Sequence, residues 1–130
     1  FSAAAELGAP IMHDYASISL SDLLTPWEVI RKRIEKAAEG DFVITIYNPK
    51  SKGRKHHLEI AIDLIKKYRK GSTPVGIVRN SGRKNIAIIM TTLDEIDYEK
   101  VYMLCVLIIG NTNTFVKKNQ IITPRGYEIK

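Results

Sequence analysis

Apolar and polar positions along the chain repeat with helical spacing in some stretches and alternate with strand spacing in others. Helical spacing predicts three main helices, over residues 2–8, 25–40 and 57–71. Thr25 and Glu28 have the spacing of a capping box, with Pro26 at the first helical position. Thr92 and Glu95 repeat that spacing and predict a further short helix. Each predicted helix therefore has at least one local start or stop signal.

Runs of β-branched and aromatic residues, bounded by turn formers, predict the strands. The predicted strands cover residues 15–21, 41–48, 73–80, 86–93, 105–111 and 115–127. Helices and strands alternate first, and hairpins follow. This order is typical of an α/β domain with a mixed, mainly parallel sheet flanked by helices. We see no internal repeat or boundary and treat residues 1–130 as one domain.

Composition supports a folded protein outside the membrane. Of the 130 residues, 45% are hydrophobic, which is enough for a sizeable core. The longest strongly apolar run, 101–110, is about half of what a membrane helix requires. It contains the one cysteine, Cys105, which we expect to be buried and unreactive. No basic-then-apolar leader is visible, so we expect a cytoplasmic protein.

Charge is unevenly distributed along the chain. The net charge is +6, and residues 50–85 hold eleven Lys and Arg against two Asp and Glu. The cations that close the helix 57–71, from Lys66 to Lys70, favour the helix dipole and are expected to face solvent. The basic loop NPKSKGRK has no such explanation. It fits a phosphate site, a nucleic-acid surface, a seat for an acidic small molecule, or a solvated turn.

The motifs for these alternatives are incomplete. The loop lacks P-loop spacing, and no G-x-G-x-x-G occurs. Aromatic residues, which would favour nucleic acid, are limited to Tyr47 and Tyr68 near the patch. The three histidines have no partner at metal-site spacing, so we expect no metal. His13 and Asp14 form either a loop pair that faces a cleft or a structural hydrogen bond.

Polar clusters follow three of the predicted strands. SLSDLLTP, YNPKSKG and VRNSGRK each stand where a strand ends. In open α/β sheets, ligands bind beyond the carboxyl ends of strands. Taken alone, each cluster is also typical of an ordinary turn. Together they predict either a ligand site along one rim of the sheet or a set of unrelated turns.

The segments GAPIMHDYASISLSDLLTPWEVI, DFVITIYNPKSKGR, TPVGIVRNSGR and IIGNTNT…IITPRGY resemble the C-terminal domain of the tetrapyrrole methylases. Within that family they are most similar to the branch that methylates C-17 of a corrin-ring precursor in cobalamin biosynthesis. The resemblance implies a two-domain enzyme, usually a homodimer, with S-adenosylmethionine between its domains. The family's G-x-G-D segment belongs to the N-terminal domain and does not occur here. We therefore expect this chain, whose first helix has no visible N-cap, to be one half of a longer protein.

The resemblance also implies roles for individual residues. Expected cofactor contacts are Tyr47, Asn48, Pro49, Asn80, Ser81, Gly82, Leu104 and Cys105. Expected partners of the substrate's carboxylates are Lys50, Lys52, Arg54, Lys55 and Arg79. Candidates for the proton transfers that accompany possible ring contraction are His13, Asp14, Ser19 and Asp22. The expected partner is thus a small-molecule tetrapyrrole, not nucleic acid or a membrane. The alternatives are another tetrapyrrole substrate within the family or, in a different class, a basic nucleic-acid-binding module.

Overall fold

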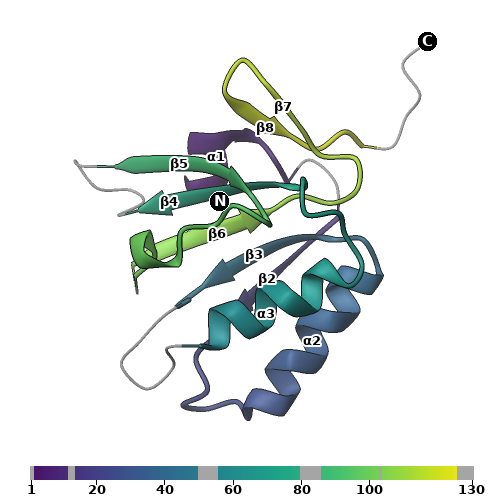
Figure 1. Ribbon diagram of the computed structural model, residues 1–130, viewed down its shortest axis with the longest axis vertical. Coiled ribbons are helices and arrows are strands. Elements are labelled where there is room, and N and C mark those ends of the chain that lie inside the picture. Colours follow the sequence, from purple (N-terminus) through teal and green to yellow (C-terminus); the bar gives the residue numbers. More distant parts are fainter. Residues whose placement is uncertain (1, 12–13, 50–55, 80–85, 103, 126–130) are drawn as a thin grey trace.

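Figure 1 shows the computed structural model, which describes residues 2–11, 14–49, 56–79, 86–102 and 104–125. Its helices are α1 (Ser2–Leu7), α2 (Trp27–Glu39), α3 (His57–Lys66) and the 3-10 helix η1 (Tyr98–Lys100). Its strands are β1 (Gly8–Ala9), β2 (Tyr15–Ser19), β3 (Val43–Tyr47), β4 (Pro74–Arg79), β5 (Ala87–Thr92), β6 (Cys105–Ile109), β7 (Phe115–Lys117) and β8 (Gln120–Ile122). Within these ranges, no helix has the length and apolar character needed to cross a bilayer.

Five strands form the central sheet in the order β2-β3-β6-β4-β5. β2 and β3 are parallel, whereas the other three neighbouring pairs are antiparallel. The predicted α/β class with a mixed sheet is therefore confirmed, but the expected predominance of parallel pairing is wrong. The reason is that β6 enters between β3 and β4 in the opposite direction to both. Local pattern predicts a strand, but it does not reveal insertion between two earlier strands.

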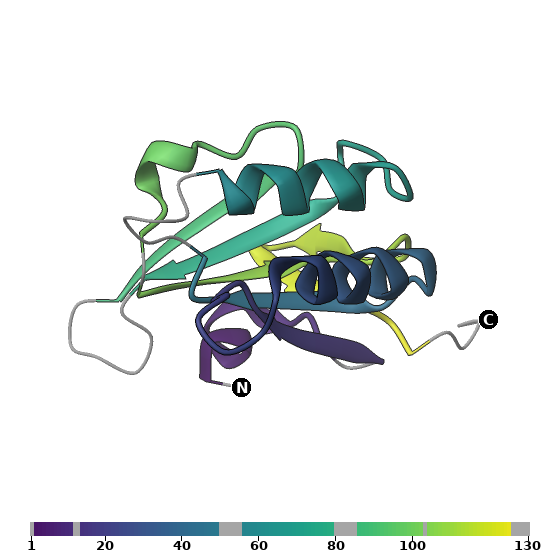
Figure 2. The ribbon, with the colours of Figure 1, turned by 90° about the horizontal axis from the view of Figure 1, so that it is seen from below.

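Helices α2 and α3 cover one face of this sheet, and α1 lies on the other side (Figure 2). Alternate strand residues point to opposite faces, so Ile44 and Ile46 join the core under α2 and α3, whereas Val43 packs with α1. The predicted apolar face of α2 is confirmed, since Ile30 and Ile34 are buried. This two-sided burial explains why β3 is apolar almost throughout.

The predicted capping box of α2 does not form. Pro26 is the N-cap residue, with φ −56° and ψ 141°, and no side chain caps the helix. The helix thus begins one residue later than predicted, and Glu28 pairs with Arg31 at 3.3 Å. In the second predicted box, Thr92 Oγ1 does donate to Glu95 Oε1 at 3.2 Å. That contact closes a turn, however, and within the part of the chain that the structure describes the helical turn that follows is the 3-10 helix η1.

A second sheet, in the order β1-β8-β7, supports α1 on the far face. The predicted single strand over 115–127 is wrong in this region, because the chain forms the antiparallel hairpin β7–β8. Lys118 and Asn119 make its turn with φ values of 50° and 59°, as two-residue hairpin loops require. Leu7 of α1 packs directly over Gly76 of β4, where an added Cβ would lie 2.5 Å from a Leu7 methyl group.

Arg69 follows α3 and contradicts the expectation of a solvated cation. Its side chain is fully buried and donates to the carbonyl oxygens of Gly110 at 2.7 Å and Ala37 at 3.4 Å, and also to that of Phe42. Asp41 lies 3.8 Å from its Nε. Burial lowers the pKa of Arg69, and Asp41 partly opposes that shift. One guanidinium therefore joins the end of α2, the start of β3 and the end of β6.

Candidate functional site

Three strands of the central sheet end at one edge, which we define by Ser19, Tyr47, Arg79 and Cys105 and call the carboxyl edge. β2 ends at Ser19 and β3 at Tyr47, and these two residues are register partners. β4 ends at Arg79, opposite Cys105 at the start of β6. Because β6 is antiparallel to β3 and β4, it begins between their ends. The predicted convergence of strand ends at one rim is confirmed for these residues.

Ser19 joins the ends of β2 and β3. Its Oγ accepts hydrogen bonds from Asn48 Nδ2 and from the backbone N–H of Ser21, both at 3.1 Å. The N–H of Leu20 donates to the carbonyl of Tyr47 at 3.1 Å. Asn48 has a φ of 50°, in the left-handed region that Asn tolerates better than most residues. The backbone beyond β3 is thus fixed, while the Tyr47 side chain stays 41% exposed.

The start of β6 presents one exposed and one buried side chain. Leu104 is 54% exposed, whereas Cys105 is 1% exposed and its Sγ accepts from the N–H of Tyr102 at 3.4 Å. Burial raises the pKa of the Cys105 thiol, and the smaller opposing effects of Tyr102 and Arg79 do not reverse this. The expected burial of Cys105 is confirmed. Of the two residues, Leu104 is the one that offers a surface to a ligand.

Arg79 is held at the carboxyl edge by an aromatic partner. Its Nε donates to the hydroxyl of Tyr102 at 3.2 Å, and its Cζ lies 4.8 Å from the Tyr102 ring centroid. This hydrogen bond raises the pKa of Arg79 against the effect of desolvation. A guanidinium carries five N–H donors, so the bond to Tyr102 leaves donors for a carboxylate. The charge and position of Arg79 are compatible with the prediction that it pairs with a carboxylate of the substrate.

A pocket of about 180 Å³ lies at the carboxyl edge, between the end of β2 and the start of α2. Its lining residues are Ser17, Ile18, Ser19, Ser21, Thr25, Ile30, Arg33 and Tyr47. Hydroxyl groups and one guanidinium therefore face a small space beside two of the predicted site residues. The pocket is smaller than the roughly 300–1,000 Å³ usual for sites that enclose a drug-sized molecule.

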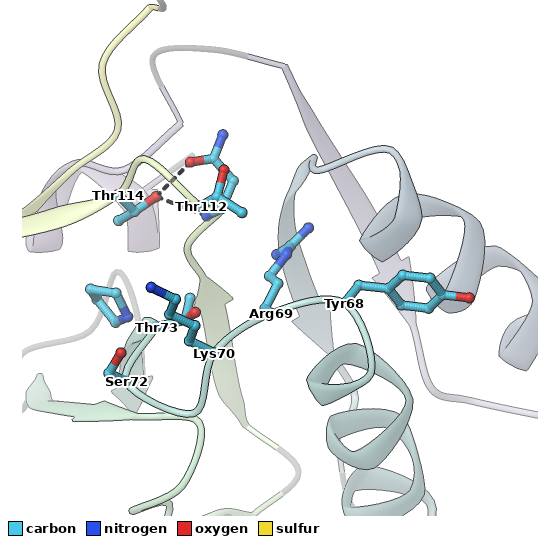
Figure 3. A pocket seen from close by; sticks show the side chains of 9 residues that line it. Tyr68, Arg69, Lys70, Ser72, Thr73, Thr112 and Thr114 are labelled. Atoms are coloured by element: carbon cyan, nitrogen blue, oxygen red, sulfur yellow. Dashed lines mark hydrogen bonds between the residues drawn. The ribbon is translucent and has the colours of Figure 1, made fainter.

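A larger pocket, of about 330 Å³, lies at the opposite edge of the sheet (Figure 3). Lys70 and Thr73 line it before β4, and Thr112 and Thr114 line it after β6. The hydroxyl of Thr114 is hydrogen-bonded to Asn111 at 3.2 Å, so part of this polar lining closes the loop itself. None of the residues predicted as a site lines this pocket.

Of the other predicted residues, Asp14 and Pro49 lie within the described ranges, and a larger group lies outside them. Asp14 precedes β2 and lies about 16 Å from Ser19, because the strand rises about 3.3 Å per residue. It therefore does not join the remaining proton-transfer candidates at the carboxyl edge. Pro49 is buried directly after Asn48. The predicted residues outside the described ranges are His13, Lys50, Lys52, Arg54, Lys55, Asn80, Ser81 and Gly82.

Sequence reasoning missed one cluster beside the carboxyl edge. Trp27 and His57 are the first residues of α2 and α3, and their rings stack with centroids 3.9 Å apart. The carboxylate of Asp22, in the loop after β2, lies 4.0 Å from His57 Nδ1. Two aromatic residues at the starts of consecutive helices are a signal that points to this contact. Among the described residues, no group of three or more His, Cys, Asp or Glu side chains is placed to hold a metal ion.

Most of the chain matches a known protein family. Residues 1–97 match the family described as Tetrapyrrole (Corrin/Porphyrin) Methylases. The chain belongs to the tetrapyrrole methylase family. The match spans 97 of 130 residues and includes β2, β3 and β4, whose ends form the carboxyl edge.

Individual relatives of this methylase chain carry more specific names. It is 53% identical over 127 residues to a probable cobalt-factor III C(17)-methyltransferase of Salmonella typhimurium (strain LT2), covering 98% of this chain and 53% of the relative. It is 41% identical to a precorrin-3B C(17)-methyltransferase of Sinorhizobium sp, covering 95% and 51%. The crystal structure of the methyltransferase CobJ has a TM-score of 0.89 at 33% identity, covering 95% and 52%. The chain thus spans about half the length of these relatives.

Proposed function

We propose that residues 1–130 are the C-terminal domain of a two-domain, S-adenosylmethionine-dependent methyltransferase of cobalamin biosynthesis. Its substrate is a tetrapyrrole of the precorrin-3B or cobalt-factor III type, and the methyl group goes to C-17. The observation that carries this proposal is the 53% identity over 98% of the chain to the Salmonella typhimurium relative. The Sinorhizobium relative supports the same ring position. The same proposal includes a cytoplasmic homodimer.

The residues of the carboxyl edge fit part of a site for the methyl donor. Tyr47 and Leu104 are exposed there and suit the faces of the cofactor's adenine ring. When bound, S-adenosylmethionine supplies an activated sulfonium methyl group. The pocket beside Tyr47, at about 180 Å³, encloses only a fraction of such a molecule. This small size supports the proposal that a second domain completes the site, as does the half-length match to the relatives.

The positive charge of the chain fits an acidic substrate. Arg79 is charged and is held at the carboxyl edge by Tyr102, where its remaining donors can pair with a carboxylate of the ring. The chain's part in methyl transfer is then to align the ring carbon with the methyl group and to exclude water. Such alignment needs a rigid edge, which the bonds from Asn48 and Ser21 to Ser19 supply.

Calorimetry with S-adenosylmethionine tests the two-domain arrangement. The whole protein, with both domains, is expected to bind the cofactor, whereas residues 1–130 alone bind it weakly or not at all. Tight binding by this chain alone would overturn the shared-site proposal. In the whole protein, Leu104→Asp is expected to weaken binding about tenfold or more, because it places a charge where an apolar surface meets the ligand.

Val116→Asp is the matched control, because Val116 on β7 is 50% exposed and Leu104 is 54% exposed. Equal loss of binding in the two variants would show that exposure, and not the carboxyl edge, decides the effect. If the whole protein methylates a different tetrapyrrole, the proposed methyl transfer stands and the proposed substrate is wrong. Sedimentation of the whole protein tests the homodimer.

A further inference from the structure

The stack of Trp27 and His57 fixes an imidazole beside the carboxyl edge. The ring centroids are 3.9 Å apart and the ring planes differ by 7°. Because both residues begin helices that pack together, the His57 ring has little freedom to turn about its χ angles. The side chain of His57 is 18% exposed. An imidazole that is held in one plane and partly shielded from water presents its two nitrogens in defined directions.

One of those nitrogens faces a carboxylate without bonding to it. His57 Nδ1 is buried and makes no hydrogen bond with any described residue. Oδ2 of Asp22 lies 4.0 Å away, about 1 Å beyond hydrogen-bond distance. A buried polar atom without a hydrogen-bond partner is unfavourable by about 1–3 kcal/mol. A small movement of the loop after β2 would remove this penalty by bringing the carboxylate onto Nδ1–H.

The position of Asp22 gives that movement a functional consequence. Asp22 follows Ser21, whose N–H is bound to Ser19 at the carboxyl edge, and Ser21 lines the pocket there. Asp22 is one-third exposed. Asp22 itself does not line this pocket but follows a residue that does, so a small change in its direction would bring its carboxylate to or away from the proposed substrate.

We propose that His57 is a positioning residue that donates from Nδ1–H to Asp22 and aims its carboxylate at the bound tetrapyrrole. The inference rests on the proposed function. Asp22 is the group that exchanges a proton with the substrate, and His57 acts through it. Trp27 keeps the imidazole in the plane that this hydrogen bond requires. A purely structural histidine in the stack would need no carboxylate opposite its buried nitrogen.

Two substitutions separate the two nitrogens of His57 in the whole enzyme. His57→Asn keeps an N–H donor near the place of Nδ1, whereas His57→Gln keeps one near the place of Nε2. If Nδ1 positions Asp22, Asn retains kcat within about threefold and Gln lowers it about tenfold or more, as expected for loss of one charge-assisted hydrogen bond. The KM for the methyl donor stays unchanged in both variants. Equal losses in Asn and Gln, or a better Gln variant, would overturn the proposal.

A double-mutant cycle tests whether His57 acts through Asp22. Asp22→Asn alone is expected to lower kcat at least tenfold. Adding His57→Gln to Asp22→Asn should lower it no further, because the group that His57 positions is already absent. Additive losses would assign His57 a separate role and refute the inference. Circular dichroism of each variant identifies any that fail to fold. If His57→Gln is one of them, His57→Ala, which removes both nitrogens, takes its place in the cycle, and Asp22→Ala likewise takes the place of Asp22→Asn.

The tautomer of His57 provides a measurement that does not depend on activity. In the wild-type protein, ¹⁵N chemical shifts of the imidazole should show the proton on Nδ1, and Asp22→Asn should change that signal. A proton found only on Nε2 in neutral His57 would contradict the contact. If the enzyme methylates no tetrapyrrole, the proposed function fails, and the tautomer still decides whether His57 bonds to Asp22.

Discussion

The buried guanidinium of Arg69 leads to a strong prediction about stability. Replacing Arg69 by Met keeps most of the side-chain volume and removes every donor. Three backbone carbonyls, those of Ala37, Phe42 and Gly110, then lose the hydrogen bonds that Arg69 gives them. These carbonyls belong to the end of α2, the start of β3 and the end of β6. The substitution therefore loosens three elements at once.

The magnitude follows from the number of acceptors left unsatisfied. A buried polar group without its partner is unfavourable by about 1–3 kcal/mol, whereas the side chain of Asp41 is 39% exposed and stays solvated without Arg69. All three carbonyls accept from the same side chain, so one substitution leaves three acceptors without their donor. With three acceptors left unsatisfied, we expect Arg69→Met to lower the free energy of unfolding by about 3–5 kcal/mol. The entire free energy of unfolding of a typical domain is only about 5–15 kcal/mol.

Urea unfolding followed by circular dichroism measures this change. The control is Lys70→Met, which removes an exposed cation next in sequence and should change the free energy of unfolding by less than about 0.5 kcal/mol. A loss below about 1 kcal/mol for Arg69→Met, or equal losses in the two variants, would refute the reasoning. It would mean that water or rearranged backbone replaces the guanidinium without penalty.

Three other predictions concern the core, a close packing contact and the hairpin. Burial raises the pKa of Cys105 above its ordinary value of 9.0, so the folded state holds the thiol proton more tightly than the unfolded state does. At pH 8.5 a thiol reagent should therefore react slowly until urea is added. The contribution of this thiol to the free energy of unfolding should fall as the pH rises past about 9. Fast reaction in the folded protein would contradict this. Gly76→Val should lower the free energy of unfolding by about 1–3 kcal/mol, because it collides with Leu7, and limited proteolysis should then cut α1 first. Changing Lys118 and Asn119 to Asn-Gly should raise the melting temperature, because that pair suits the positive φ values of the turn; a lower melting temperature would argue against the turn.

The helices and most strands could be predicted because their signals are local. The apolar spacing of residues 25–40 needs only α-helical geometry to be interpreted, and α2 and its buried face follow from it. The turn at Lys118–Asn119 was missed because it lacks the glycine that usually marks such hairpins. The predicted start of α2 was one residue too early, because Pro26 occupies the N-cap position and Trp27 is the first helical residue.

The rest depends on contacts between distant residues. Nothing near β6 in the sequence states that it enters between β3 and β4, and that insertion places Leu104 beside the ends of both strands. Arg69 resembles its solvated neighbours until its acceptors, 27 to 41 residues away, are known. The convergence of strand ends was predicted correctly because it rests on a rule of sheet architecture. The proximity of Asp22 to His57 was not predicted, because it depends on how α2 and α3 pack against each other.

The most direct test of the account is the product made by the whole enzyme. Supplied with ¹³C-methyl-labelled S-adenosylmethionine and a precorrin-3B or cobalt-factor III type substrate, it should transfer one methyl group, which NMR should locate at C-17. Loss of that product in a Leu104→Asp variant, with retention in Val116→Asp, would connect the reaction to the carboxyl edge. A label on another carbon, or transfer to no tetrapyrrole at all, would contradict the proposed function.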